Sequence, residues 1–158
     1  MSEARPVSFP ILLVEDEEDH ARLIMRVLTK RIGVSNPIHW VKNGIEALAY
    51  LQPNSRDAQH SPRPALVLLD MKLPMMSGFE VLKRLQDDER CRTIPAVMLT
   101  TSANAEDRAK AFELGAKDYL TKSVNFADFI ASIRRLVHDF GLLEAANAES
   151  SAREWSGA

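Results

Sequence analysis

Short apolar runs alternate with segments of helical periodicity along most of this chain. The runs occupy residues 11–14, 38–41, 65–69, 96–99 and a short stretch around Tyr119 and Leu120. Apolar runs of this length, bounded by turn residues or charges, are typical of buried strands. The run at 65–69 is the strongest strand, because it is apolar throughout and ends at Asp70.

Apolar residues after each run recur at the spacing of one helix face. Residues 21, 24, 25 and 28 are all apolar and fall at positions i, i+3, i+4 and i+7 of a helix. Similar faces lie within residues 44–51, 79–85, 109–116 and 126–140. Five strand–helix units in succession predict an α/β fold, with helices covering both faces of a parallel sheet.

The two ends of the chain and one internal segment lack this pattern. Residues 1–8 are polar and predict an N-terminal extension, and residues 9–143 contain the five units as one domain. Residues 52–64 hold three prolines without periodicity, which predicts a loop. Residues 144–158 are rich in Ala, Ser and Glu and predict a flexible C-terminal tail.

The composition of the chain argues against some binding partners and some cellular compartments. The 158 residues include 20 Lys and Arg against 22 Asp and Glu, for a net charge of −2, so the basic field typical of nucleic-acid binding is absent. The apolar run at 11–14 is too short for a signal-peptide core or a membrane span. Cys91, the single cysteine, cannot form an internal disulfide and fits a reducing compartment. We therefore expect a cytoplasmic protein with no nucleic-acid or membrane partner.

Two residue types do not suggest a site of their own. The histidines at positions 20, 39, 60 and 138 lack the spacing of metal ligands, so we expect structural or surface roles for all four. Cys91 lies among Asp88, Glu89, Arg90 and Arg92, which predicts a surface-loop residue without a redox role.

Polar side chains stand at the carboxyl ends of four of the predicted strands. They are Glu15 and Asp16 after the first strand, Asp70 after the third, Thr100 and Thr101 after the fourth, and Lys122 after the fifth. Parallel strands bind ligands outside their carboxyl ends, so these groups should converge at one edge of the sheet. Clustered carboxylates need a cation, and Mg²⁺ takes one or two of them while keeping several waters. A carboxylate can also attack phosphorus to give an aspartyl phosphate, while the hydroxyl and ammonium groups contact the phosphoryl oxygens.

The ordered set of motifs resembles the receiver domain of two-component response regulators, the CheY-like family. The matching stretches are Ile11–Asp16, Val67–Pro74 with Gly78, Pro95–Thr101, Gly115–Ala116 and Tyr119–Lys122. The resemblance covers residues 9 to 141 and implies a flavodoxin-like (βα)5 sandwich with strand order 2-1-3-4-5. It also implies a protein that accepts a phosphoryl group and signals through a surface change.

The resemblance assigns the acidic residues to phosphorylation and to metal binding. It implies that Asp70 accepts the phosphoryl group from a phosphohistidine of a sensor histidine kinase. Asp16, Asp70 and the backbone carbonyl of Lys72 would ligate Mg²⁺, and Glu15 would act through water in the outer shell of the metal.

The same resemblance assigns the residues that contact the phosphoryl group and transmit its presence. Lys122, Thr100 and Thr101 would form the phosphoryl-binding and switch group. Tyr119 matches the aromatic residue that turns inward with the threonine, which changes the face around the fourth helix, fifth strand and fifth helix. Lys72 and Ser102 flank the site and are the positions expected to tune its rates.

Two residues depart from the family pattern. Glu15 stands where Asp is usual and is one methylene longer. Ser123 follows Lys122 where Pro in a cis peptide is usual, and a cis bond before a non-proline residue costs about 2.5–4 kcal/mol. We therefore predict either a trans Lys122–Ser123 peptide or, if the peptide is cis, an unusually well anchored loop.

A finer resemblance indicates the partners. The segments 61–64, 100–102 and 120–123 resemble small regulators that are paired with phytochrome-type sensor kinases in bacteria. The expected partners are such a kinase, a downstream protein or phosphotransfer protein, and a second copy of the chain through the fourth-helix, fifth-strand and fifth-helix face.

Three other functions remain as alternatives. A Mg²⁺-dependent phosphohydrolase of the haloacid-dehalogenase type also uses a nucleophilic Asp, but it has a second Asp two residues later, where this chain has Lys72. A receiver-like binding module that is never phosphorylated is disfavoured, because every phosphorylation residue is present. A DNA-binding regulator is disfavoured, because the residues after Gly141 cannot supply a helix-turn-helix. We expect no turnover of an external substrate, only self-dephosphorylation.

Overall fold

The computed structural model describes residues 9–51, 63–122 and 125–142. Its strands are β1 (Ile11–Val14), β2 (Ile38–Val41), β3 (Leu66–Asp70), β4 (Ala96–Thr100) and β5 (Asp118–Thr121). Its helices are α2 (Glu18–Arg26), continued by the π-helical turn η2 (Val27–Ile32), then α3 (Gly44–Leu51), α5 (Gly78–Asp87), α6 (Ala105–Glu113) and α7 (Phe126–Asp139). The strands form one parallel sheet in the order β2-β1-β3-β4-β5, so the predicted fold class and strand order are confirmed.

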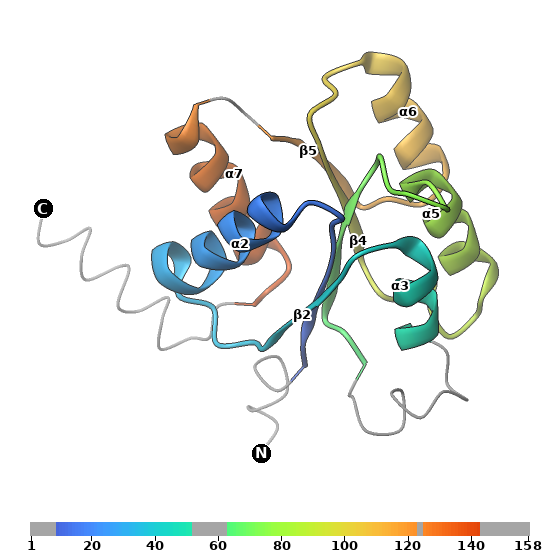
Figure 1. The fold of residues 1–158 in the computed structure, drawn as a ribbon, viewed down its shortest axis with the longest axis horizontal. Helices are drawn as coiled ribbons and strands as arrows, with labels where there is room; N and C mark the ends of the chain where they lie inside the picture. The colour runs from blue at the N-terminus through green and yellow to red at the C-terminus, as the bar shows by residue number, and fades with distance from the viewer. Residues whose placement is uncertain (1–8, 52–62, 123–124, 143–158) are drawn as a thin grey trace, which may run out of the picture.

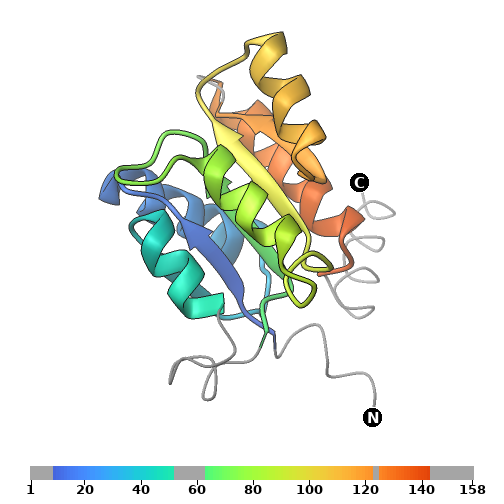
Figure 2. The same cartoon turned by 90° about the vertical axis from the view of Figure 1, so that its right-hand side faces the viewer.

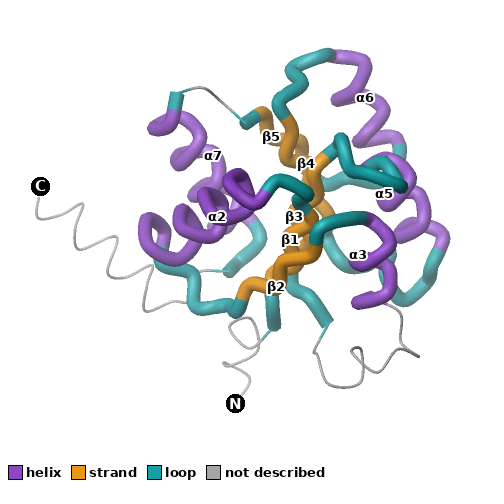
Figure 3. The backbone as a smooth tube through the Cα atoms, in the orientation of Figure 1, coloured by secondary structure: helices purple, strands orange, loops and turns teal. Residues whose placement is uncertain are grey.

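The sheet lies between two helical layers. Helices α2 and α7 cover one face, and α3, α5 and α6 cover the other (Figures 1 and 3). Side chains of β1 alternate between the layers: Ile11 and Leu13 pack in the α2/α7 core, and Leu12 and Val14 pack in the opposite core. Because both faces are buried, the strand is apolar throughout rather than alternating. Figure 2 shows the second layer from the front, with α5 crossing the middle of the sheet.

Polar caps define where three of the helices begin. Ser77 accepts a hydrogen bond from the backbone N–H of Glu80 at the start of α5. Asn104 and Asn125 cap α6 and α7 in the same way. Such caps satisfy N–H groups that have no partner within the helix, which stabilises each start by about 1 kcal/mol. The helices after β3, β4 and β5 are therefore anchored close to the edge of the sheet where the candidate residues lie.

Strands β3 and β4 extend one residue further than their apolar patterns predict. Asp70 is paired in register with Leu99, and Thr100 is paired with Thr121. Both polar residues belong to the ladder, because backbone pairing does not depend on the character of the side chain. The carboxylate and the hydroxyl are consequently mounted on rigid strand ends.

The chain after Asp70 turns back tightly. The backbone N–H of Gly78 donates to the carbonyl of Met71 at 2.8 Å. A Cβ at Gly78 would collide with the backbone oxygen of Asp70, so this close approach requires glycine. Met75, at the tip of the loop, has a φ of 70°, the left-handed region that side chains with a Cβ rarely adopt.

Cys91 is not a surface residue. Only 5% of it is exposed, and it packs in the core on the α3/α5/α6 side of the sheet. Burial raises the pKa of its thiol. The prediction from its charged neighbours was wrong, because the turn after α5 directs Cys91 inward and its neighbours outward.

Several sequence predictions fall outside the described residues. They concern the extension at 1–8, most of the loop at 52–64, the tail at 144–158 and the Lys122–Ser123 peptide. Among the residues that the structure describes, no helix has the length and apolar character needed to cross a membrane.

Candidate functional site

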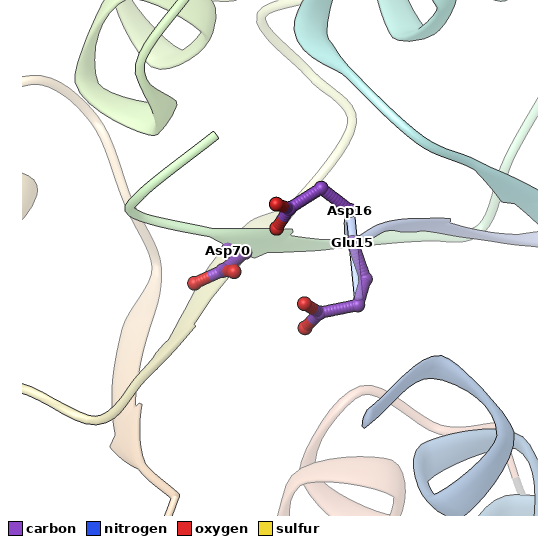
Figure 4. A group of neighbouring side chains, drawn as sticks. All are labelled: Glu15, Asp16 and Asp70. Carbon is purple, nitrogen blue, oxygen red and sulfur yellow. The ribbon is translucent and has the colours of Figure 1, made fainter. Parts of the chain in front are cut away.

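Three carboxylates meet at the carboxyl ends of β1 and β3. One ligand oxygen each from Glu15, Asp16 and Asp70 lies within 4.8 Å of the other two (Figure 4). Glu15 is 1% exposed and Asp70 is 9% exposed, whereas Asp16 faces solvent. The convergence predicted from the strand ends is therefore present for all three acids.

Lys122 reaches this group from the end of β5. Its Nζ lies 2.7 Å from Oε1 of Glu15 and 3.8 Å from Oδ2 of Asp70. The side chain of Lys122 is 12% exposed, so the ammonium is largely removed from water. Glu15 is the nearer of its two carboxylate partners.

The surroundings of Asp70 disfavour its charged form. The pKa of its carboxyl group is raised to about 6, chiefly because the group is buried. The Lys122 ammonium opposes this change, whereas the carboxylate of Glu15 adds to it. The backbone N–H of Lys72 also lowers the pKa of Asp70, while the Lys72 side chain is exposed. A further cation beside Asp70 would favour the ionised, nucleophilic carboxylate.

The donor set fits a hard divalent cation. It consists entirely of carboxylate oxygens, the ligands that Mg²⁺ and similar ions prefer. The exposed Asp16 leaves one side of the group open to water, which suits an ion that retains part of its hydration shell. The site therefore has the chemistry of a divalent-metal centre.

Thr100 and Tyr119 are joined through one loop residue. Thr100 is 1% exposed, and its Oγ1 accepts a hydrogen bond from the backbone N–H of Ser102 at 3.1 Å. Tyr119 is 3% exposed, and its hydroxyl donates to the backbone oxygen of Ser102 at 2.8 Å. The tyrosine ring is thus in the inward position, linked through Ser102 to the threonine beside Asp70.

The first turn of α6 supports this link. The Ser102 hydroxyl donates to Oδ2 of Asp107 at 2.8 Å. The Arg108 guanidinium lies 5.8 Å from the centroid of the Tyr119 ring, and its Nη1 donates to the Tyr119 carbonyl at 3.3 Å. Ser102 and Tyr119 are therefore both in direct contact with the start of α6.

Thr101 follows β4 and lines a pocket together with Lys122. Thr101 is exposed, and the pocket, of about 280 Å³, lies between α2 and α7. Leu23 and Phe126 line the apolar part of the same pocket. The structure thus places Thr101 and Lys122 on the wall of the same pocket.

His20 is a site residue that the sequence analysis missed. Its Nδ1 lies 3.4 Å from Nζ of Lys122 and 3.8 Å from Oε2 of Glu15. The expectation of a structural or surface role did not include these contacts, and the side chain is 40% exposed. No pattern in the sequence indicated them, because Glu15 precedes α2 and Lys122 lies 102 positions after His20 along the chain.

Comparison with known proteins identifies the family. A family model described as response regulator receiver domain matches residues 11–134. This chain belongs to the response regulator receiver family. The resemblance inferred from its motifs is confirmed.

The similar proteins include regulators from archaea and cyanobacteria. The probable methanogenesis regulatory protein FilR2 of Methanothrix harundinacea is 40% identical over 128 residues, which are 81% of each protein. Response regulator Rcp1 of Synechocystis is 39% identical over 124 residues, 78% of this chain and 83% of Rcp1.

Two crystal structures share the fold of this chain. The Mn²⁺-bound form of Rcp1 matches with a TM-score of 0.74 and 36% identity, over 85% of this chain and 94% of Rcp1. The phosphorylated cyanobacterial phytochrome response regulator RcpA matches with a TM-score of 0.75 and 32% identity, over 84% and 94% of the two chains. This receiver is therefore homologous to phytochrome response regulators.

Proposed function

We propose that Asp70 accepts a phosphoryl group from a sensor histidine kinase of the phytochrome type. The observation that carries the proposal is the position of Asp70, a buried carboxylate at the end of β3 with Lys122 3.8 Å away. The homology to Rcp1 and RcpA supports the class of kinase.

The proposed transfer is a nucleophilic displacement at the phosphorus atom of the phosphohistidine. A carboxylate oxygen of Asp70 attacks phosphorus, and the P–N bond of the donor phosphohistidine breaks. The electrons of that bond stay on the departing imidazole nitrogen, which takes up a proton. Lys122 and the hydroxyl of Thr100 contact the phosphoryl oxygens and stabilise the charge spread over them.

Mg²⁺ is the proposed ion, held by the carboxylates of Asp16 and Asp70 and by the backbone carbonyl of Lys72. When bound, it neutralises charge on the phosphoryl oxygens. Glu15 would act through water, because one of its oxygens already accepts a hydrogen bond from Lys122 at 2.7 Å.

We propose that phosphorylation changes the conformation of one face of the protein, and that this change is the signal. Thr100, Thr101, Lys122 and Tyr119 respond to the phosphoryl group, and the face of α6, β5 and α7 carries the response to a downstream protein, a phosphotransfer protein or a second copy. The contacts from Asp107 and Arg108 to the Ser102–Tyr119 link support this route. The side chains of Lys72 and Ser102 are the proposed determinants of rate.

The proposed activity is restricted to the phosphoryl group on the protein itself. The protein dephosphorylates itself, turns over no external substrate and works in the cytoplasm. The proposed receiver unit is residues 9–143. A phosphohydrolase is disfavoured because Lys72 stands where the second acid of that class belongs. A receiver-like module without phosphorylation is disfavoured by the assembled site.

The test is incubation with phosphoramidate or acetyl phosphate and Mg²⁺, followed by intact-mass measurement. We expect a single phosphate adduct on the wild-type protein and none on Asp70→Asn. Absence of the adduct from the wild type favours the non-phosphorylated module and contradicts the proposal. Steady hydrolysis of a free phosphomonoester also contradicts it and favours the phosphohydrolase.

A further inference from the structure

His20 faces the ammonium group of the site from a rigid support. It is the third residue of α2, and two neighbours in that helix, Ala21 and Ile24, are 0% and 2% exposed in the core beneath. Such anchoring fixes the direction of the His20 side chain, because the helix cannot rotate without exposing that core. The imidazole is itself only partly exposed, at 40%.

The two ring nitrogens of His20 have different partners. Nδ1 faces Lys122 at 3.4 Å, and Nε2 lies 3.7 Å from Oε1 of Glu17. An ammonium group has only donors, so Nδ1 must accept. A tautomer with its hydrogen on Nε2 directs that hydrogen toward the Glu17 carboxylate and leaves Nδ1, which also lies 3.8 Å from Oε2 of Glu15, to accept from Lys122.

The Lys122 ammonium therefore has two acceptors at hydrogen-bond distance, and the Asp70 carboxylate lies further away, at ion-pair distance. Glu15 lies at 2.7 Å, His20 at 3.4 Å and Asp70 at 3.8 Å from Nζ. The two nearer acceptors hold the ammonium, and the third N–H is left to point toward Asp70. Without His20, one N–H bond loses its protein partner, and the flexible stem of Lys122 can swing into the pocket between α2 and α7 that both residues line.

We propose that His20 is a positioning residue that orients Lys122 toward the phosphoryl group on Asp70. The inference rests on the proposed function, since it assumes that Lys122 contacts that group. His20 acts only through Lys122 and touches neither the phosphoryl group nor the metal. With this role, a side chain in the first turn of α2 joins those at the strand ends in controlling the reaction.

The first test is the rate of phosphorylation by phosphoramidate in Mg²⁺, followed by intact mass. We expect His20→Ala to react about fivefold more slowly, the factor that corresponds to one hydrogen bond of about 1 kcal/mol. His20→Asn should react at the wild-type rate, because its Oδ1 occupies the position of Nδ1. His20→Gln should behave like His20→Ala, because its polar atoms lie where Nε2 was.

Two further variants separate positioning from a general effect of the substitution. His138→Ala, which removes an imidazole that is 77% exposed on α7, should leave the rate unchanged. In a Lys122→Met background, which keeps the apolar stem, His20→Ala should cause no additional loss. A wild-type rate for His20→Ala, equal rescue by Asn and Gln, or the same fivefold loss without Lys122 would each overturn the proposal.

A measurement on the unphosphorylated protein distinguishes this inference from the proposed function. Lysine ammonium groups held by hydrogen bonds exchange slowly enough to give ¹H–¹⁵N NMR signals. We expect the signal of Lys122 to weaken in His20→Ala and to persist in His20→Asn. Absence of phosphorylation in the wild type with this NMR result intact would overturn the proposed function, while the hold of His20 on Lys122 would still stand. An unchanged Lys122 signal in His20→Ala would overturn the positioning role alone.

Discussion

Oε1 of Glu15 accepts a hydrogen bond from Nζ of Lys122 at 2.7 Å, across 107 positions of sequence. The bond joins the end of β1 to the end of β5, two strands separated in the sheet by β3 and β4. It is the shortest of the Lys122 contacts described above. The extra methylene of Glu15, compared with the Asp usual in this family, gives the carboxylate the reach that this contact uses.

Removal of Lys122 should destabilise the fold through Glu15. Lys122→Met leaves a carboxylate that is 1% exposed without its cation, and we expect a loss of about 3 kcal/mol in the free energy of unfolding. Urea denaturation at neutral pH without metal measures the loss. The double variant Glu15→Gln/Lys122→Met should recover most of it. A Lys122→Met protein as stable as the wild type would show that Glu15 is not held by this pair.

Removal of the Asp70 charge should stabilise the metal-free protein near neutral pH. The pKa of Asp70 is raised to about 6 in the folded chain, so the folded state binds the proton more tightly than the unfolded state. The charged carboxylate therefore costs stability above about pH 6, and the cost disappears as the pH falls toward the unfolded value.

The check is the melting temperature of wild type and Asp70→Asn between pH 4 and pH 8. We expect Asp70→Asn to melt higher at pH 7 to 8, with the difference shrinking as the pH falls through about 6. Asp87→Asn, which changes an exposed acid at the end of α5, serves as the control. A difference that stays constant with pH would contradict the assignment of this penalty to Asp70.

Mg²⁺ should stabilise the folded chain by an amount that rises with the logarithm of its concentration above the Kd. A ligand that binds only the folded state adds about 2.7 kcal/mol at one hundred times its Kd. Thermal unfolding in a Mg²⁺ titration should show the rise for the wild type and little of it for Asp16→Asn. Asp19→Asn removes a nearby acid from the first turn of α2 and should keep the response. An equal rise in all three proteins would indicate ion binding elsewhere.

Met75 should be replaceable by glycine with a gain in stability. Its φ of 70° costs a residue with a Cβ about 1 kcal/mol relative to glycine, and its side chain is 72% exposed, so little packing is lost. We expect Met75→Gly to raise the free energy of unfolding by about 0.5 kcal/mol, since the unfolded chain also gains freedom. Urea denaturation of Met75→Gly and Met75→Ala gives the comparison, and Met75→Ala should show no gain. A less stable Met75→Gly protein would argue against strain at this position.

The features predicted correctly are those that depend on strand order and strand ends. Four apolar runs located β1 to β4, and parallel pairing then brought Asp70 and Glu15 to one edge whatever their separation in sequence. The finer pairing within that edge was not predictable in this way. Whether Lys122 pairs more closely with Glu15 or with Asp70 depends on the length and rotamer of each side chain.

The error at Cys91 and the missed contacts of His20 have a common physical origin. His20 and Cys91 both lie in locally polar sequence, where a pattern of charges indicates solvent. Their actual surroundings are set by tertiary packing: α2 turns His20 toward β5, and the turn after α5 directs Cys91 into the core. Local patterning reports the average environment of a segment, so single inward-facing residues within it are missed.

The link between Thr100 and Tyr119 uses only the peptide groups of Ser102, its N–H for the threonine and its carbonyl for the tyrosine. Any amino acid except proline supplies both groups. The side chain at position 102, which here bonds Asp107, is thus separate from the connection itself. A substitution at this position other than proline is therefore expected to remove the contact with Asp107 while the two hydrogen bonds that link Thr100 to Tyr119 remain.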